Sequence, residues 1–221
     1  MRSMDSLVEN LHRIHRVITR ALAVALAHGE NFARKGFDDE ASRRGFVDYA
    51  RCLVLLLRAH HDGEEEMLFP RLVGAASGGT LAELEAQHRE LVAAMHDAVA
   101  ATDRAEAGEP ARAWIGELVD ALAIIEPRWL KHVELEQQTV TQAMLDDLMG
   151  HEEQQALMRA ISEHGQKNGH VPELAVPFVL YNLEAGDRAA VQRLMPTQVT
   201  NELLPGPWRT QWAPMRPFLL A

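Results

Sequence analysis

Apolar residues recur every three or four positions along four long stretches of the chain, which is the spacing of one buried helical face. The first stretch covers residues 5–28, and its apolar face includes Leu11 and Ile18. Gly29 is expected to end this helix, because glycine readily adopts the left-handed conformation that closes a helix. The polar residues 30–39 that follow are then expected to form a loop.

The second and third stretches predict two further helices separated by a break in the chain. The second helix is expected over residues 39–66, and the break begins at Pro70 and includes the Ser-Gly-Gly run at 77–79. The third helix is expected over residues 80–106, with a capping box in which the Thr80 side chain caps the first turn.

The fourth stretch predicts a helix from Pro110 to about Leu148, kinked at Pro127. Four long helices with mostly short connections predict an all-α fold, an antiparallel up-down-up-down four-helix bundle over residues 1–149. The pattern then changes, since seven of the ten prolines lie in the last fifty residues. Residues 150–221 are therefore expected to form a helical C-terminal appendage with an irregular tail. Its helices are expected over residues 151–164, 176–184 and 187–195.

Charge and cysteine content exclude several classes of function. The formal net charge is −10, from 22 Lys and Arg against 32 Asp and Glu, so neither nucleic acid nor an anionic membrane is an expected partner. The single Cys52 excludes an intramolecular disulfide and a site with several thiolate ligands. No apolar run approaches the roughly 20 residues that span a bilayer, and the run Ala21–Ala27 is short for a signal peptide. A cytoplasmic protein is therefore expected.

Each predicted long helix places one histidine on its apolar face. In the first helix, His15 lies four residues after Leu11 and three before Ile18, and the other helices show equivalent spacings. The four candidates for inward-facing imidazoles are His15, His60, His88 and His132.

Two of these histidines have a glutamate four residues later, on the same face of the helix. The pairs are His60 with Glu64 and His132 with Glu136. Two buried carboxylates facing each other are costly unless cations neutralise them, and two divalent ions would do so while engaging all six side chains. Nitrogen and oxygen donors of this kind suit iron, manganese or zinc.

Plainer explanations exist for the same residues. A single inward histidine is more often a hydrogen-bonded core residue than a ligand, and an i, i+4 His–Glu pair is often a solvated ion pair. His61 and Glu65 form a third such pair, shifted about 100° around the helix, and are candidates for residues that orient the ligands. His12 is the nearest rival to His15. The joint pattern over four helices favours the metal site. The other histidines are expected in ordinary surface, capping or core roles; they are His28, His96, His151, His164 and His170.

The segment HHDGEEEMLFP (His60–Pro70) resembles the HHxxEExxLFP signature of hemerythrin-like, or HHE cation-binding, domains. Segments around His15, His88 and His132 are similar to the other ligand-bearing helices of that family, in the same order, over roughly residues 7–148. The resemblance implies a four-helix bundle around two iron ions bridged by an oxo or hydroxo group, although zinc or manganese would accept the same donors. The metal ligands that it implies, with both glutamates bridging the ions, are His15, His60, Glu64, His88, His132 and Glu136.

The sequence departs from oxygen-carrying hemerythrins at one position. They have a second histidine one turn after the third-helix histidine, where this chain has Val92. The expected count is then four imidazoles rather than five, which makes the site more symmetric, frees a coordination position and weighs against reversible oxygen carriage. Tyr49 is a candidate extra oxygen donor, although a packed core tyrosine is the more ordinary interpretation.

These observations leave three functional hypotheses from different classes. The first is a di-iron protein that binds or senses O₂, NO or peroxide, as the resemblance implies. The second is an enzyme that decomposes peroxide, as a catalase does. The third is a metal-free helical bundle that acts through protein contacts. Metal content and reactivity with O₂ and peroxide separate the three.

Overall fold

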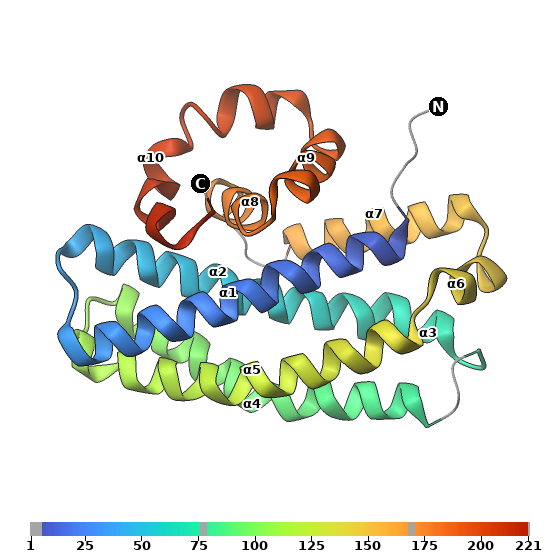
Figure 1. The fold of residues 1–221 in the computed structure, drawn as a ribbon, viewed down its shortest axis with the longest axis horizontal. Helices are drawn as coiled ribbons and strands as arrows, with labels where there is room; N and C mark the ends of the chain where they lie inside the picture. Colours follow the sequence, from blue (N-terminus) through green and yellow to red (C-terminus); the bar gives the residue numbers. More distant parts are fainter. Residues whose placement is uncertain (1–5, 76–78, 168–170, 221) are drawn as a thin grey trace.

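The computed structural model describes residues 6–75, 79–167 and 171–220, and every regular element in these ranges is a helix. Four long helices lie side by side (Figure 1). They are α1 (Leu7–Lys35), α2 (Glu40–Gly63), α4 (Thr80–Glu106) and α5 (Ile115–Thr139). α1 packs along α5, α5 packs along α4, and α2 contacts both α4 and α1. The four helices therefore surround a common interior, and the predicted all-helical fold is confirmed.

The first helix is longer than the sequence predicts. α1 is capped by the Ser6 side chain and runs to Lys35, so Gly29 lies inside it and the predicted loop at 30–39 is mostly helical. A Cβ added to Gly29 would lie 2.9 Å from Val119 Cγ2 of α5, which means that this glycine allows two helices to approach closely. The helix instead ends at Gly36, which has a φ of +80°. The predicted start at Asp5 lies outside the described residues.

The second helix does not stop where it was predicted to. α2 begins after an Asp39 capping box, and after Gly63 the chain continues without a break into the π-helix η1 (Glu64–Leu68) and the short α3 (Phe69–Leu72). Pro70 is accommodated in the first turn of α3, where its missing N–H does not matter. The expected break at Pro70 is therefore wrong, and the chain leaves the helix at Val73.

The predicted capping box of the third helix is also wrong. Thr80 is the first helical residue of α4 and Gly79 occupies the cap position, with the Gly79 carbonyl accepting a hydrogen bond from the Glu83 backbone N–H at 3.0 Å. Residues 77 and 78 of the predicted break lie outside the described residues.

The predicted fourth helix is split into two. A short 3₁₀ turn, η2 (Ala111–Ala113), precedes α5, which contains Pro127 as expected. α5 ends at Thr139 rather than near Leu148, because Thr141 is extended and its side chain caps a separate helix, α6 (Gln142–Leu148).

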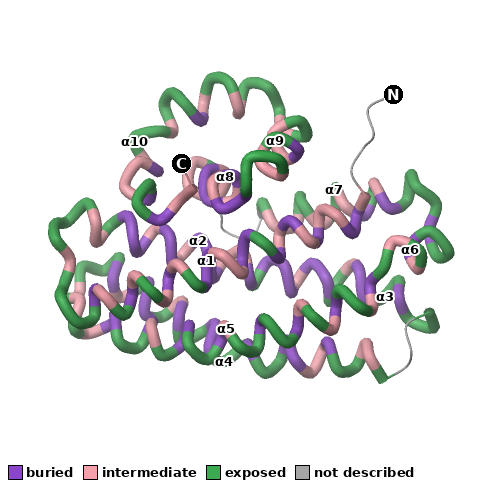
Figure 2. The backbone as a smooth tube through the Cα atoms, viewed as in Figure 1, coloured by how far each residue is buried: buried purple, intermediate pink, exposed green. Residues whose placement is uncertain are grey.

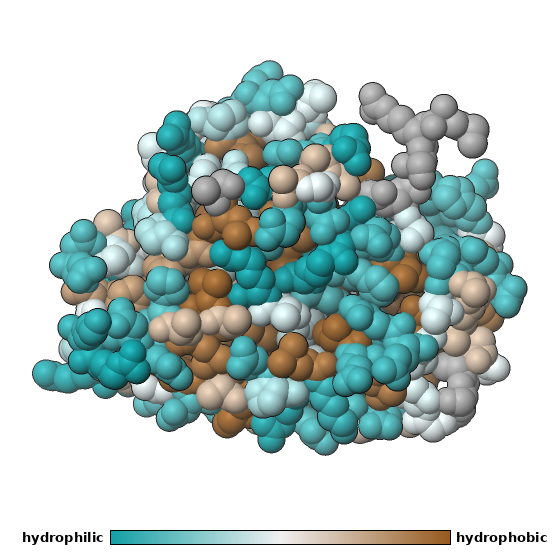
Figure 3. All heavy atoms as spheres, in the orientation of Figure 1, coloured by the Kyte–Doolittle hydropathy of each residue, from teal (hydrophilic) through white to brown (hydrophobic). Residues whose placement is uncertain are grey.

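The rest of the described chain lies against α1 and α2, on the side away from α4 and α5 (Figure 1). α7 covers the predicted helix at 151–164, and α8 and α9 begin earlier than the two short helices predicted there. These elements are α7 (His151–Lys167), α8 (Pro172–Tyr181), α9 (Ala185–Leu194), η3 (Val199–Leu203), α10 (Arg209–Trp212) and η4 (Ala213–Phe218). The face of the molecule in Figure 3 is mostly hydrophilic with scattered apolar patches. Within the described residues no helix is long and apolar enough to cross a membrane.

A buried polar cluster anchors the C-terminal helices to the bundle. Asn182, at the end of α8, accepts hydrogen bonds through its Oδ1 from Tyr49 of α2 at 2.8 Å and from Arg20 of α1. The Asn182 amide nitrogen donates to the Phe178 carbonyl at 2.8 Å, and Arg20 also donates to the Phe218 carbonyl at 3.1 Å. Four segments of the chain, α1, α2, the end of α8 and η4 (Ala213–Phe218), are thus joined at one point, which we call the Asn182 anchor.

The buried apolar residues form two clusters along the bundle, and Figure 2 shows the buried positions running along the inner sides of the helices. The chain passes from one cluster to the other along α1, along α4, and between the end of α2 and η1. On α1 the change falls between Leu11 and Val17, and on α4 it falls between Leu84 and Leu91. A layer of buried polar residues therefore separates two apolar cores.

Candidate metal centre

Seven buried side chains of types that bind metals meet in this polar layer. Each is at most 6 % exposed. The seven are His15 of α1, His60 and His61 of α2, Glu64 of η1, His88 of α4, and His132 and Glu136 of α5. The structure thus brings together all six ligands that the sequence predicts, and it adds His61.

Four of these side chains form one group in which a ligand atom from each lies within 4.8 Å of the others: His15, His60, Glu64 and Glu136. Within it, His15 Nε2 lies 2.9 Å from Glu136 Oε2, and His60 Nε2 lies 3.0 Å from Glu64 Oε1. Each imidazole of this group therefore has a carboxylate oxygen beside it.

The other three side chains form a second group by the same criterion: His61, His88 and His132. The rings of His61 and His88 stack at 3.9 Å, and the Nε2 atoms of His88 and His132 are 3.2 Å apart. Glu64 Oε2 lies 3.4 Å from His88 Nε2, and Glu136 Oε2 lies 3.7 Å from His132 Nε2. Both carboxylates therefore lie between the two groups, where each could bridge a pair of ions.

Most of the inward-facing atoms have no hydrogen-bond partner in the part of the chain that the structure describes. The unpartnered atoms are His15 Nε2, His60 Nε2, both ring nitrogens of His61, both oxygens of Glu64, His132 Nδ1 and Glu136 Oε2. His15 Nε2 and Glu136 Oε2 are close but not aligned for a hydrogen bond. An unsatisfied buried polar atom costs about 1–3 kcal/mol, so this many in one place calls for a further species between them.

Burial shifts the pKa values of most of these groups so that their neutral forms are favoured. Burial, followed by the neighbouring Glu136 carboxylate, raises the pKa of Glu64 well above its usual range. Burial and the surrounding histidines lower the pKa values of His60 and His61 well below the usual range, and that of His132 to about 3. Neutral imidazoles are the form that binds a metal, and a divalent cation would favour the ionised carboxylates. The donor set therefore fits metal cations bound between these side chains.

Comparison with known families agrees with this geometry. Residues 6–151 match the hemerythrin HHE cation-binding domain. The chain belongs to this family. No curated protein and no solved structure is matched by the chain. The family shows that the domain is of a cation-binding type, and the buried His/Glu layer is where this HHE domain can hold a metal ion.

Aromatic side chains line the HHE site. The fully buried Trp129 ring lies 5.5 Å from the rings of both His15 and His60, and its indole nitrogen donates a hydrogen bond to Thr19 at 2.9 Å. On the other side, the Phe69 ring stacks on His88 at 5.4 Å. These contacts limit how the imidazoles can rotate and place an aromatic ring on each side of the layer.

Several other candidates lie outside the two groups. His12 is only partly buried, with its ring 6.2 Å from that of His15. Tyr49 belongs to the Asn182 anchor and is a packed core residue, as the more ordinary interpretation had it. Val92 is 41 % exposed and lines a surface groove of about 160 Å³ between α2 and α4. His170 lies outside the described residues.

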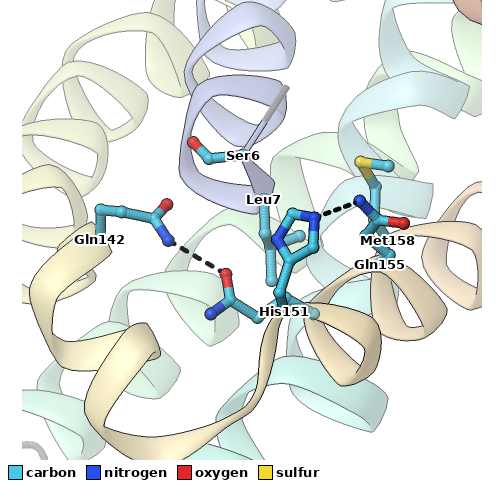
Figure 4. Close-up of a pocket in the computed structure, with 7 residues that line it drawn as sticks. Ser6, Leu7, Gln142, His151, Gln155 and Met158 are labelled. Carbon is cyan, nitrogen blue, oxygen red and sulfur yellow. Dashed lines mark hydrogen bonds between the residues drawn. The ribbon is translucent and has the colours of Figure 1, made fainter. Parts of the chain in front are cut away.

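A small cavity of about 50 Å³ lies at the end of the bundle, among α1, α6 and α7 (Figure 4). Its lining includes His151, Gln142 and Gln155, and the His151 ring hydrogen-bonds Gln155 at 2.7 Å. None of the seven side chains of the polar layer lines it. His151 therefore has a local structural role, as expected from the sequence.

The sequence reasoning left His61 undecided. His61 is 4 % exposed, and it stacks on His88 and lies edge-on to His132. The signal that could have found it is the doubled histidine itself, placed where α2 changes into the wider π turn of η1, a feature that is frequent at functional sites.

Proposed function

We propose that this protein is a non-haem di-iron protein of hemerythrin type that binds or senses O₂, NO or peroxide. Residues 1–149 would form the up-down-up-down bundle that holds the ions, with residues 150–221 appended to it. The observation that carries the proposal is the convergence of five imidazoles and two carboxylates, all buried, on one layer in which most of the inward-facing atoms lack hydrogen bonds.

The donors divide naturally between two ions. One ion would be held by His15 and His60, the other by His61, His88 and His132, and both would be held by Glu64 and Glu136. Histidine and carboxylate donors together favour iron, manganese or zinc over calcium or copper(I). We propose iron because a bound Fe(II) pair would supply reversible two-electron chemistry toward O₂. Membership of the HHE family makes this chemistry the natural expectation.

The fifth imidazole changes the expectation about symmetry. With four histidines the halves of the site would be nearly alike, whereas His61 gives one ion three imidazoles and leaves the other with two. Hemerythrin-type oxygen binding depends on unequal irons, so the reservation raised by Val92 no longer weighs against it. Trp129 and Phe69 would keep water away from the ions, which favours a reversible ligand over hydrolysis.

The test is metal content followed by reactivity. Protein purified without chelator should contain about two irons per chain, and the reduced form should take up one O₂ per pair and release it intact under vacuum. The Glu64→Ala variant should lose the metal, while Glu66→Gln, which changes an exposed carboxylate nearby, should keep it. Rapid O₂ evolution from peroxide without reversible binding would favour the catalase-like enzyme instead. If the chain binds no metal, the remaining hypothesis is a metal-free helical bundle that acts through protein contacts.

A further inference from the structure

Within the described part of the chain, a hydrogen bond links the polar layer directly to a solvent-exposed charge. His88 Nδ1 forms a hydrogen bond of 2.9 Å with Glu65 Oε1. The His88 side chain is 2 % exposed, whereas the Glu65 side chain is 46 % exposed. Glu65 thus lies at the boundary of the layer, with one oxygen on a buried imidazole and the rest of the carboxylate facing water.

Two neighbouring glutamates at the start of η1 take different roles. Glu64 is 1 % exposed and points into the layer, while Glu65 lies outside it and reaches across to α4. Consecutive residues of a helix point in different directions, so one short segment supplies an inner carboxylate and an outer one.

The hydrogen bond decides which nitrogen of His88 is available inside. A carboxylate can only accept, so the Nδ1 atom must carry the proton and Nε2 keeps its lone pair. That Nε2 atom is the one that faces Glu64 Oε2 at 3.4 Å and His132 Nε2 at 3.2 Å. Glu65 therefore fixes His88 in the tautomer and orientation that a metal in the layer requires.

The negative charge of Glu65 lies beside the group of three histidines, His61, His88 and His132. The group of His61, His88 and His132 consists of neutral donors, whereas the other group contains both buried carboxylates. By contrast, the outer contact of His15 is the neutral amide of Gln137, at 3.4 Å from Nδ1. A hydrogen-bonded carboxylate makes an imidazole a more basic ligand, so Glu65 strengthens the half of the site that would share both of its carboxylates, Glu64 and Glu136, with the other half.

We infer that Glu65 is a positioning residue for the metal ion held by His61, His88 and His132. This inference rests on the proposed metal site and goes beyond it, because it assigns the two ions unequal dependence on one residue that binds neither. Loss of a partner of this kind typically lowers metal affinity by about 10–100-fold.

The probe is zinc, which is redox-inert and accepts the same donors. Calorimetric titration of metal-stripped full-length protein should show two zinc ions in the wild type. Glu65→Ala should weaken one of the two binding events by about 10–100-fold and leave the other unchanged. Glu65→Gln keeps an acceptor for Nδ1–H but removes the charge, so it should fall between the wild type and Glu65→Ala.

The matched control is Glu66→Gln. Glu66 is the next residue of the same turn, is 62 % exposed and lies 3.6 Å from His164, which is not part of the site. The Glu66→Gln variant should bind both zinc ions as the wild type does. In iron-loaded protein, Glu65→Gln should move the reduction potential to a more positive value while Glu66→Gln does not, a change that a purely structural role would not produce.

The outcomes separate this inference from the proposed function. Two zinc ions in the wild type with no weakening in either Glu65 variant would overturn the inference alone. Equal weakening of both binding events in Glu65→Ala would also overturn it, since the effect would then be a general loosening. A wild-type chain that binds no zinc would overturn the proposed metal site and this inference together.

Discussion

The Asn182 anchor and the His/Glu layer are both polar clusters packed inside the protein, and they differ in one respect. In the Asn182 anchor, the Asn182, Tyr49 and Arg20 side chains are joined by hydrogen bonds to one another and to backbone carbonyls. In the His/Glu layer, eight inward-facing nitrogen and oxygen atoms have no hydrogen-bond partner among the described residues. Burial alone therefore does not point to a functional site, whereas a concentration of unsatisfied buried atoms does.

The difference follows from what each cluster has to hold. The anchor joins segments of the protein to each other, so its side chains find their hydrogen-bond partners in the protein itself. The layer contains acceptors and imidazoles that face a common point, an arrangement that is unfavourable by itself and favourable around cations. The same contrast predicts that the effect of a substitution should depend on metal in the layer and should be independent of metal in the anchor.

The largest expected effect comes from Glu64→Gln. With metal, this variant should lose at least one ion per chain, since a carboxylate between both groups is removed. Without metal, at pH 8, it should be more stable than the wild type by about 1–3 kcal/mol, because a buried carboxylate lacking partners is replaced by a neutral amide. Urea unfolding of stripped and zinc-loaded protein measures the change in the free energy of unfolding in each state. The Glu66→Gln variant serves as the exposed control.

A stripped Glu64→Gln protein that is less stable than the stripped wild type would show that Glu64 is already satisfied without a cation. That result would remove the distinction between the two clusters.

The second prediction concerns pH. In stripped protein the pKa values of His60 and His132 are lowered from 6.5, so the stability that they contribute is present above pH 6.5 and is lost as the pH falls below it. The pKa of Glu64 is raised from 4.5, so its contribution falls as the pH rises above 4.5. The free energy of unfolding should therefore be greatest near pH 6.5.

Zinc should change the alkaline side of that profile. On that side the stripped protein should lose stability through Glu64, by at most about 1.4 kcal/mol per pH unit, until that carboxyl group ionises, whereas in zinc-loaded protein it is already ionised and held. Free energies of unfolding between pH 5 and 8, with and without zinc, give the comparison. Parallel profiles in the two states would contradict the assignment of Glu64 to the cation site.

The anchor should behave differently. Asn182→Ala leaves the Tyr49 hydroxyl and the Arg20 guanidinium without their shared acceptor, so it should lower the free energy of unfolding by about 1–3 kcal/mol. The loss should be the same with and without zinc, and zinc stoichiometry should not change. Tyr49→Phe removes one hydrogen bond and should cost about 1 kcal/mol. A metal-dependent loss in either variant would mean that the anchor is coupled to the site.

The sequence predicted the position of the long helices better than their ends. Apolar spacing placed all four, because that spacing reports which face is buried. The ends depended on contacts that spacing does not contain. Gly29 allows α1 to approach Val119 of α5, and Pro70 is tolerated because a new helical turn begins next to it. In both cases the residue that usually ends a helix is used for another purpose.

The site shows the same division. Residues such as His15 and His88 could be predicted because they follow the apolar spacing of their own helices. His61 could not be placed, because adjacent helix positions point about 100° apart and a narrow interior would exclude one of the pair. The layer is wide enough to bury both His60 and His61, since His61 stacks on a ring from α4. Such a contact between helices is not visible in the spacing along one of them.

The smallest expected effect tests where the layer ends. Val92 occupies the position of the second histidine in oxygen-carrying hemerythrins, but here it is 41 % exposed and lines the groove between α2 and α4 with Arg58 and Asp62. A histidine there would meet water and those charged side chains rather than the layer. Val92→His should therefore leave zinc stoichiometry and affinity unchanged and alter stability by no more than about 0.5 kcal/mol.

His61→Leu supplies the complementary variant. This variant removes a buried imidazole, so it should lower the affinity for the zinc ion bound by His88 and His132. Adding Val92→His to the same chain should not restore that affinity. Zinc titration of the single and double variants decides between the two positions. Restoration of zinc binding by Val92→His would show that a side chain at position 92 of α4 reaches the ions. The layer of unsatisfied polar groups would then extend further along α4 than the structure indicates.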